Sequence, residues 1–358
     1  MENRIKLSIR EKIKEPEHVA TLVLEPLSNE FNYYPGQFLT FIFKDSNAKE
    51  FRRSYSFSST PGVDNFPTIT VKKMPNGSAS RYLVDHVQVG DVVEAIPPAG
   101  QFLLPKSTGK ARDIFLIGGG SGVTPLFSIL KQILHFELES RVTLFLANSN
   151  EQTIIFRKQL RQLAKEFPTQ LKAIHFLSDT KMILSELREL EVPVEIRIQR
   201  ISNALVAQLV EQHLHFDRRD AQFFLCGPKT LMLKASQMLR YMQFDENQIH
   251  QEIFGIIEPY RPPRDVYKDS QVRIQFFGKN FLVPVKAGDT ILEAAEKIGL
   301  ELPYSCRSGI CTTCTGRCTS GKVEMFTNAG QINTDMSNGV VFTCVAYPLT
   351  DKVEIEIG

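Results

Sequence analysis

The stretch CRSGICTTC, residues 306–314, places three cysteines within one short loop. Four residues separate Cys306 from Cys311, two separate Cys311 from Cys314, and a further cysteine, Cys344, follows after twenty-nine more. The intervening residues are small and polar, so the loop can wrap closely around a bound group, and its backbone N–H groups can donate hydrogen bonds to sulfur. Cys344 lies in VVFTCVAY (340–347), which has the composition of a separate strand.

This spacing is that of a plant-type [2Fe–2S] site, in which two bridged irons take four thiolates from one loop and one distant segment. We therefore predict Cys306, Cys311, Cys314 and Cys344 as metal ligands. Cys318 is an alternative fourth ligand, which we disfavour because Cys344 stands in a separate segment. Zinc held by part of this set is an alternative, although structural zinc usually has a second close cysteine pair. A disulfide framework is disfavoured because we find no secretory signal.

Composition narrows the class of protein. A chain of 358 residues predicts two or three domains, and 42% hydrophobic residues are ample for buried cores. The net charge of +2 gives no reason to expect a nucleic-acid partner. There is no apolar run of membrane-spanning length, and the charged start MENRIKLSIREKIKEPEH lacks a signal-peptide pattern. We expect a cytoplasmic protein with no membrane or nucleic-acid partner.

The first part of the chain, residues 4–104, consists of strand-length runs separated by Pro, Gly and Asn. The runs are IKLSIREKI (5–13), HVATLVLEP (18–26), QFLTFIF (37–43), FRRSYSFSS (51–59), TITVKKM (68–74) and DVVEAIP (91–97). One helical stretch, ASRYLVDHV (79–87), interrupts them. The pattern predicts a small antiparallel β-barrel.

The next part, from about Ala111 to Glu258, alternates strands with helices and so predicts a parallel α/β domain. The segments are DIFLIGGG (113–120), SGVTPLFSILKQIL (121–134), RVTLFLAN (141–148), TIIFRKQLRQLAKEF (153–167), LKAIHFLSD (171–179), NALVAQLVEQH (203–213) and AQFFLCGP (221–228). The glycines before the first helix allow a pyrophosphate to approach its N-terminus. Thr124 is a possible N-cap, with Pro125 as the first helical residue.

Residues 272–358 resemble a plant-type ferredoxin domain, which implies a β-grasp fold. The resemblance runs through QVRIQFFGKNFLVPV (271–285) as an opening hairpin, AGDTILEAAEKIGLELPYSC (287–306) as a helix leading into the loop, and the four ligand positions. A ferredoxin module carries one electron at a time. Another part of the chain should therefore supply its electrons.

Four further motifs resemble, in the same order, those of the ferredoxin–NADP reductase superfamily. They are RSYS (53–56), GGGSGVTP (118–125), CGP (226–228) and HQEIFG (250–255). Each is weak alone, because an Arg and a Tyr on a strand or a Cys at a strand end are more often structural. Because all four motifs occur in the same order as in the superfamily, chance does not explain them well. PPAGQF (97–102) also stands where the superfamily closes its barrel.

The resemblance implies a role for each matched residue. Catalytic roles fall to Ser56, Cys226, Glu252 and Phe254. Flavin-binding roles fall to Arg53, Ser54, Tyr55, Ser56, Gly77, Ser78, Ala79 and Ser80. Nicotinamide-binding roles fall to Gly118, Gly120, Ser121, Gly122, Thr124, Pro125, Ser149, Cys226, Gly227 and Pro228. A guanidinium fork suits phosphate oxygens and a flat ring can cover a flavin face.

We therefore predict an FAD-binding β-barrel domain (1–108), an NAD(P)-binding α/β domain (109–257), a proline-rich linker (258–271) and a [2Fe–2S] ferredoxin domain (272–358). This order is similar to reductase components of multicomponent oxygenases, such as those of phenylacetyl-CoA epoxidases. It implies transfer of electrons from NAD(P)H through flavin and cluster to a partner oxygenase or other metalloprotein. FAD is preferred over FMN because two motifs suggest a pyrophosphate.

Two other functions remain open at this point. One is a flavin diaphorase or oxidase whose ferredoxin domain mainly recognises a partner. The other is a zinc-stabilised interaction protein. The choice between NADH and NADPH is also open, because the strand-end position that usually discriminates between them is the uncharged Ser149.

Overall fold

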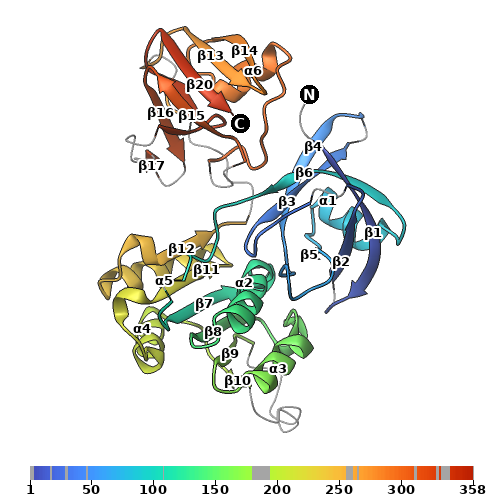
Figure 1. Cartoon of the computed structure of the whole chain (residues 1–358), viewed down its shortest axis with the longest axis vertical. Helices are drawn as coiled ribbons and strands as arrows, with labels where there is room; N and C mark the ends of the chain where they lie inside the picture. Colours follow the sequence, from blue (N-terminus) through green and yellow to red (C-terminus); the bar gives the residue numbers. More distant parts are fainter. Residues whose placement is uncertain are drawn as a thin grey trace.

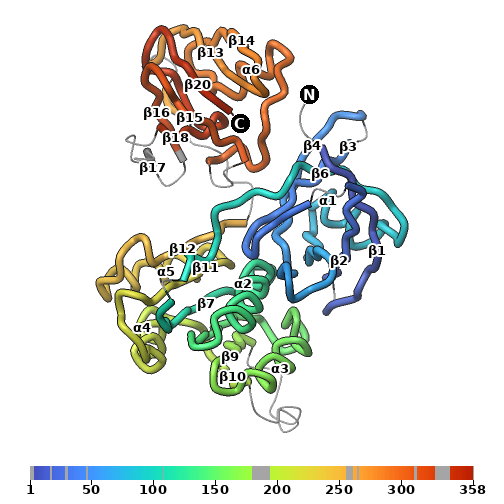
Figure 2. The backbone as a smooth tube through the Cα atoms, in the orientation of Figure 1, coloured from blue at the N-terminus to red at the C-terminus, as the bar shows by residue number. Residues whose placement is uncertain are grey.

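The computed structural model describes residues 4–16, 18–28, 31–45, 47–107, 109–179, 194–254, 261–263, 266–309, 313–327, 330–331 and 339–357. Three domains follow one another along the chain, coloured blue to cyan, green to yellow, and orange to red in Figure 1. The trace in Figure 2 shows the C-terminal domain on the side of the first domain where strand β4 (Glu50–Ser56) lies. Among the described residues, no helix is both long enough and apolar enough to cross a membrane.

The N-terminal domain is a six-stranded antiparallel sheet in the order β4-β3-β6-β1-β2-β5. Besides β4, its strands are β1 (Ile5–Lys14), β2 (Val19–Pro26), β3 (Phe38–Lys44), β5 (Thr68–Lys72) and β6 (Val92–Ala99). A bridge between Phe57 and Ile69 joins the two edges, so the sheet closes into the predicted barrel. Fully buried side chains such as Leu7, Ile9 and Phe41 fill its interior. Helix α1 (Ser78–Arg81) continues into a π-helical turn at Tyr82–His86.

The middle domain is a six-stranded parallel sheet in the order β10-β9-β8-β7-β11-β12, as predicted. The strands are β7 (Asp113–Gly119), β8 (Arg141–Asn148), β9 (Leu171–Leu177), β10 (Val194–Arg197), β11 (Gln222–Cys226) and β12 (Ile249–Glu252). The helices are α2 (Val123–Phe136), α3 (Arg157–Glu166), α4 (Asn203–His213) and α5 (Lys229–Tyr241). Parallel strands with both faces covered are buried and apolar, which explains runs such as IFLI.

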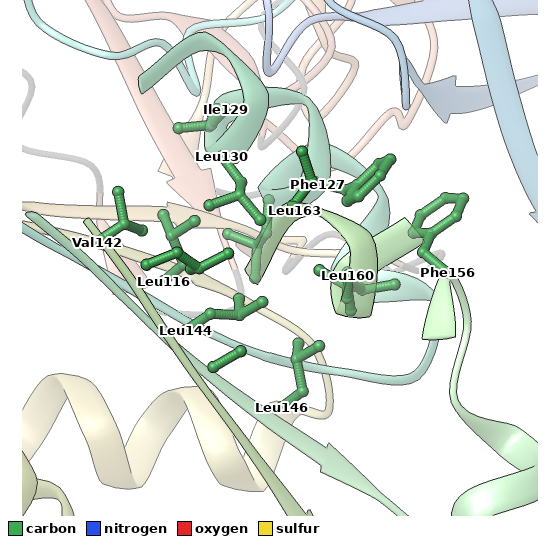
Figure 3. Packing of buried hydrophobic residues seen from close by; sticks show 14 of the residues in the cluster. Leu116, Phe127, Ile129, Leu130, Val142, Leu144, Leu146, Phe156, Leu160 and Leu163 are labelled. Atoms are coloured by element: carbon green, nitrogen blue, oxygen red, sulfur yellow. The ribbon is translucent and has the colours of Figure 1, made fainter. Parts of the chain in front are cut away.

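Helices α2 and α3 cover one face of this sheet. Figure 3 shows Leu116 and Leu144 from the strands against Leu130 of α2 and Leu160 of α3. A second buried cluster lies on the other face, where Val206 of α4 and Ala235 of α5 pack. Because strand order reverses at β7, the carboxyl ends of β7 and β11 form the crevice where ligands bind in such sheets.

Helix α2 begins earlier than the sequence suggested. The helix starts at Val123, with Gly122 as an N-cap that makes no side-chain capping bond. Thr124 is therefore not the N-cap, and its hydroxyl donates to the carbonyl of Ser121 at 2.8 Å. The prediction was wrong because a 3₁₀ turn at Gly120–Gly122 already winds the backbone before the helix. Pro125 is tolerated in the first turn, where its missing N–H has no intrahelical partner to lose.

The C-terminal domain contains a five-stranded sheet in the order β14-β13-β20-β15-β18 and a smaller sheet, β17-β16-β19. The strands are β13 (Ser270–Phe276), β14 (Lys279–Val285), β15 (Thr315–Ser320), β16 (Val323–Thr327), β17 (Gly330–Gln331), β18 (Val340–Phe342), β19 (Ala346–Pro348) and β20 (Lys352–Ile357). Helix α6 (Ile291–Lys297) packs on the core and starts with a Thr290–Glu293 capping box. The predicted hairpin and helix are confirmed, and the β-grasp arrangement holds.

The segment predicted as a linker is described only in part. Tyr267 packs on Tyr347 of the C-terminal domain at 5.1 Å between ring centroids, and its hydroxyl donates to Glu324 at 3.0 Å. Strand β13 begins at Ser270. The last residues before β13 are thus attached to the C-terminal domain, and the predicted boundaries between the domains stay predictions.

Candidate functional site

The carboxyl ends of strands β4, β11 and β12 meet at the half-buried carboxyl group of Glu252. In the parallel sheet, Cys226 of β11 pairs with Gly118 of β7 on one side and with Glu252 of β12 on the other. The hydroxyl of Ser56, at the end of β4, donates to Oε2 of Glu252 at 2.9 Å. Three of the four predicted catalytic residues therefore lie together. Phe254, the fourth, follows two residues after Glu252 and is exposed.

The surroundings favour the protonated forms of these groups. Burial raises the pKa of Glu252 to about 8, although the hydrogen bond from Ser56 lowers it. Burial also raises the pKa of the Cys226 thiol, and the nearby Glu252 raises it further. Cys226 is fully buried, whereas Glu252 keeps partial access to solvent. Near neutral pH the site thus offers a protonated carboxyl group in contact with a serine hydroxyl, a combination suited to proton transfer.

Strand β4 presents different residues on its two faces. Because side chains alternate along a strand, Arg53 and Tyr55 share one face, and Ser54 and Ser56 share the other. The half-buried Tyr55 ring meets Phe41 edge-on at 5.8 Å, and burial raises the pKa of its phenol. The guanidinium of Arg53 donates to the carbonyl of its neighbour, residue 52, at 2.6 Å. The predicted flavin contacts Arg53 and Tyr55 are therefore brought together.

Ser54 behaves differently from the prediction of a flavin contact. Its hydroxyl hydrogen-bonds with the Thr40 hydroxyl at 2.9 Å and with the hydroxyl of Ser305 in the C-terminal domain. It thus faces away from Arg53 and Tyr55.

The GSAS segment forms the start of α1. Gly77 is the N-cap, Ser78 is exposed, and Ala79 and Ser80 are buried. The hydroxyl of Ser80 is engaged within the turn, since it accepts from the Met74 N–H at 3.1 Å and donates to the Gly77 carbonyl at 3.2 Å. Of the two serines in this segment, Ser78 is the one whose side chain is accessible to a ligand.

The glycine loop after β7 and the CGP turn after β11 fit together only without side chains. A Cβ on Gly122 would lie 2.1 Å from the carbonyl oxygen of Cys226, and one on Gly118 would lie 2.6 Å from the same atom. A Cβ on Gly227 would lie 2.8 Å from the backbone nitrogen of Gly119. The glycines thus serve close packing of two loops at the sheet's crevice. Ser121 and Pro228 flank this junction.

Lys72, at the end of β5, was missed by the sequence reasoning. Its Nζ lies 4.0 Å from where a Cβ on Gly120 would be, so this exposed cation reaches the glycine loop from the barrel. A cation beside a loop that can accept phosphate is a candidate phosphate contact. No local signal marked it, because TITVKKM reads as an ordinary amphipathic strand.

Ser149 is exposed at the end of β8, where its carbonyl accepts from the Asp179 N–H at 2.8 Å. Two charged residues come close to this strand end, namely Glu151 and Arg157, and they form an ion pair with each other. Arg157 also acts on the buried His175 of β9, whose pKa is lowered to about 4 mainly by burial and further by this positive charge. The sequence did not place these charges together.

Two of the predicted metal ligands, Cys314 and Cys344, are in contact, and Cys306 acts on Cys344 electrostatically. The Sγ atoms of Cys314 and Cys344 are 3.2 Å apart, and the thiols of Cys306 and Cys314 raise the pKa of Cys344 far above its ordinary range. Sulfurs gathered in this way can all be ionised only when a cation compensates their charge, so the donor set fits a metal cluster. Cys311 lies outside the described residues, and no group of three potential ligands around one metal position occurs within them.

Cys318 lies apart from this set. Its half-buried thiol, on β15, contacts the carbonyl of Ser320 at 3.4 Å. The geometry supports the preference for Cys344 over Cys318 as the fourth ligand, and the ligand set stays a prediction.

Comparison with known protein families matches each domain. Residues 4–103 match an oxidoreductase FAD-binding domain, residues 116–237 an oxidoreductase NAD-binding domain, and residues 274–349 a 2Fe-2S iron–sulfur cluster binding domain. These matches assign FAD, a nicotinamide nucleotide and a [2Fe–2S] cluster as the cofactors. The zinc alternative is therefore wrong, because the cysteine loop belongs to an iron–sulfur domain.

Two curated relatives span nearly the whole chain. One is the ferredoxin reductase component of 3-ketosteroid-9-alpha-monooxygenase from Rhodococcus rhodochrous, 30% identical over 98% of this chain and 95% of that protein. Another is a component of the 1,2-phenylacetyl-CoA epoxidase of Escherichia coli (strain K12), 30% identical over 93% of this chain and 91% of that protein. Among solved structures, phthalate dioxygenase reductase shares the three-domain fold with a TM-score of 0.59, 22% identity, and coverage of 99% and 98% of the two chains.

Proposed function

We propose that this chain, which belongs to the family of FAD- and [2Fe–2S]-containing reductase components of multicomponent oxygenases, supplies electrons to a separate oxygenase component. The observation that carries the proposal is the presence of all three modules in one chain, together with relatives that match it nearly end to end. Those relatives are named as parts of a steroid monooxygenase and a phenylacetyl-CoA epoxidase. An oxygenase acting on a substrate of one of these two kinds is the acceptor we propose.

The residues that would hold each cofactor follow from the site geometry. Arg53 and Tyr55 on one face of β4, with the exposed Ser78, would hold FAD, and Lys72 would contact a phosphate beside the glycine loop. The interlocked glycine loop and CGP turn, residues 118–125 and 226–228, would receive the nicotinamide nucleotide together with Ser149. The cysteines at 306, 311, 314 and 344 would ligate the cluster.

When bound, FAD accepts a hydride from NAD(P)H and the cluster takes electrons singly, so the cofactors supply the redox chemistry. The chain's own residues hold the cofactors in position and carry the protons of the site. Burial raises the pKa of Glu252 to about 8, and its Oε2 accepts from the Ser56 hydroxyl at 2.9 Å, so this carboxyl group can hold a proton beside Ser56. Cys226 is neutral and fully buried, which keeps the crevice floor apolar.

Reconstitution tests the partner. The purified holoprotein would be mixed with the oxygenase component of a steroid monooxygenase or of a phenylacetyl-CoA epoxidase, and oxygenated product would be measured with NADH and with NADPH. We expect product with one of the two components. Reduction of dyes alone, with no product from any oxygenase and no reduction of a one-electron acceptor protein, would favour the flavin diaphorase function instead.

A further inference from the structure

The cluster-binding loop contacts the flavin strand directly. Nη1 of Arg52, on β4, donates to the carbonyl of Tyr304 at 3.1 Å, although the two residues are 252 positions apart. The Arg52 guanidinium also lies over the Tyr304 ring, 3.9 Å from its centroid. Two residues further along β4 and one residue further along the loop, the hydroxyls of Ser54 and Ser305 are hydrogen-bonded. Ser305 immediately precedes the predicted ligand Cys306.

Tyr304 is fixed within its own domain as well. The guanidinium of Arg307 lies 4.0 Å from the centroid of the same ring, and Arg307 donates to Oε2 of Glu296 on α6 at 3.1 Å. Arg307 adopts a φ of 54°, a left-handed conformation that directs the chain around the loop. The ring that meets Arg52 is therefore held in place by an ion-paired arginine anchored on α6.

On the barrel side, the contact is made by a buried arginine and by a serine that is fixed within the sheet. Arg52 is only 6% exposed, and a buried guanidinium is costly unless its donors and its charge are matched. A charge-assisted hydrogen bond and a cation–π contact, both to Tyr304, supply part of that compensation. Ser54 is at the same time tied to Thr40 of β3 by its 2.9 Å hydrogen bond, so the receiving strand is fixed in the barrel.

Because side chains alternate along β4, the contact with Tyr304 lies on the face opposite Arg53 and Tyr55. Arg52 and Ser54 occupy one face of β4, while Arg53 and Tyr55, the residues proposed to hold the flavin, alternate with them on the other face. One four-residue segment thus meets the flavin site and the cluster loop on opposite sides. A shift of Tyr304 relative to β4 changes the separation of the two cofactor sites.

We propose that Arg52 is a positioning residue for internal electron transfer, which it serves by docking the cluster-binding loop onto the flavin-binding strand through Tyr304. This rests on the electron path from FAD to [2Fe–2S] and not on the identity of the oxygenase. Lysine would retain the charge but lose the planar fork and most of the stacking.

The test uses the full-length holoprotein with Arg52→Gln, Arg52→Lys and, as matched control, Arg273→Gln. Arg273 is an exposed arginine of the C-terminal domain, paired with Glu354 at 3.0 Å. Anaerobic stopped-flow absorbance would follow flavin reduction by NAD(P)H and then cluster reduction, and steady-state assays would compare ferricyanide with cytochrome c. Flavin and iron contents would be measured for every variant.

We expect Arg52→Gln to slow cluster reduction by about tenfold or more, the usual scale for loss of a charge-assisted hydrogen bond, while flavin reduction and ferricyanide activity stay within about twofold of wild type. Cluster reduction in Arg52→Lys should be slower than in wild type but faster than in Arg52→Gln. In Arg273→Gln it should match wild type. Unchanged cluster reduction in Arg52→Gln would overturn the proposal. An equal loss of flavin reduction would also overturn it, because Arg52 would then belong to the flavin site.

Tyr304→Leu provides a second variant that leaves the barrel unaltered. It removes the ring beneath the guanidinium but keeps the carbonyl that accepts from Arg52, so it should show a smaller loss that is still selective for cluster reduction, with iron retained, and it serves as the test if Arg52→Gln fails to fold. In a double-mutant cycle the two losses should be less than additive, because both variants remove the cation–π contact between Arg52 and the Tyr304 ring. Additive losses would mean that Arg52 and Tyr304 act separately. Because no oxygenase enters these assays, an incorrect acceptor assignment would leave their outcome unchanged.

Discussion

The barrel meets its two neighbouring domains through junctions of different kinds. Toward the nicotinamide domain, several buried groups cross: Thr60 donates to the Ser128 carbonyl at 2.7 Å, Ser128 donates to the Ser59 carbonyl at 2.5 Å, and Lys131 pairs with Asp64 at 2.5 Å. Toward the ferredoxin domain, the hydrogen bonds that the described part of the chain shows from β4 come from two residues, Arg52 and Ser54.

The two junctions therefore differ in how many contacts hold them in a fixed geometry. The first junction includes the Ser56–Glu252 hydrogen bond and lies beside the interlocked glycine loop and CGP turn, which require fixed geometry. The second depends on a few polar contacts beside the cluster loop, so it can be perturbed without disturbing the first.

Loss of a cluster ligand should abolish the function of the ferredoxin side alone. We expect Cys306→Ser, Cys311→Ser, Cys314→Ser and Cys344→Ser each to lose or destabilise the cluster, since each iron needs two thiolates. Cys318→Ser should keep it, because that thiol contacts backbone carbonyls of β15 and its following turn. Iron analysis and visible spectra give the measurement. If Cys344→Ser kept the cluster and Cys318→Ser lost it, the fourth ligand would be Cys318 and not Cys344.

Removal of the whole ferredoxin domain should leave the first junction working. A protein of residues 1–263 ends before Tyr267, which packs on the removed domain. We expect it to keep flavin and to reduce ferricyanide with NAD(P)H at a rate near that of wild type, but to lose most cytochrome c reduction. Wild-type protein is the control in both assays. Undiminished cytochrome c reduction would mean that electrons bypass the ferredoxin domain.

Changes on the flavin face of β4 should weaken flavin retention. Arg53→Ala removes a guanidinium fork and Tyr55→Ala removes a half-buried ring, so each should weaken flavin binding by about tenfold or more. Bound flavin after gel filtration measures the effect, with Arg273→Ala as an exposed control. If both variants retained full flavin, the flavin would have to bind elsewhere.

The buried carboxyl group should make stability depend on pH. Between the ordinary pKa of 4.5 and the raised pKa of about 8, folded protein keeps a proton on Glu252 that unfolded protein has lost. Its contribution to stability therefore falls as the pH rises from about 5 to about 8. We expect Glu252→Gln to show a smaller decline of thermal midpoint across this window, measured by calorimetry.

Glu354→Gln, at an exposed ion pair, is the matched control for that experiment. Equal pH dependence in wild type and Glu252→Gln would show that Glu252 is ionised in the folded protein.

Nucleotide preference should be the smallest effect. Ser149 carries no charge, and the adjacent Glu151 and Arg157 neutralise each other as an ion pair. We expect less than about 100-fold discrimination between NADH and NADPH in kcat/KM, equivalent to about 2.7 kcal/mol. Steady-state kinetics at one ionic strength measure it. Glu151→Gln should shift the preference toward NADPH by releasing Arg157, and a wild-type preference beyond a thousandfold would show that an unidentified charge reaches the ribose.

The sequence alone determined the parts of this protein whose signals are local. Cysteine spacing marks the cluster loop because three of the four predicted ligands come from one short segment. Strand-length runs separated by Pro, Gly and Asn predict the barrel strands, and strands that alternate with helices predict the parallel sheet. The order of the RSYS, GGGSGVTP and CGP motifs gave the domain sequence, which the fold confirms.

Only the tertiary structure decided which distant side chains touch. Ser56 reaches Glu252 across 196 residues, and Arg52 reaches Tyr304 across 252, and neither pair leaves any periodicity or spacing in the sequence. The position of the α2 start likewise depended on a 3₁₀ turn. Contacts between domains are set by how separately folded surfaces meet, so an arginine that looks like an ordinary surface residue of β4 becomes, in three dimensions, the residue that meets the cluster loop.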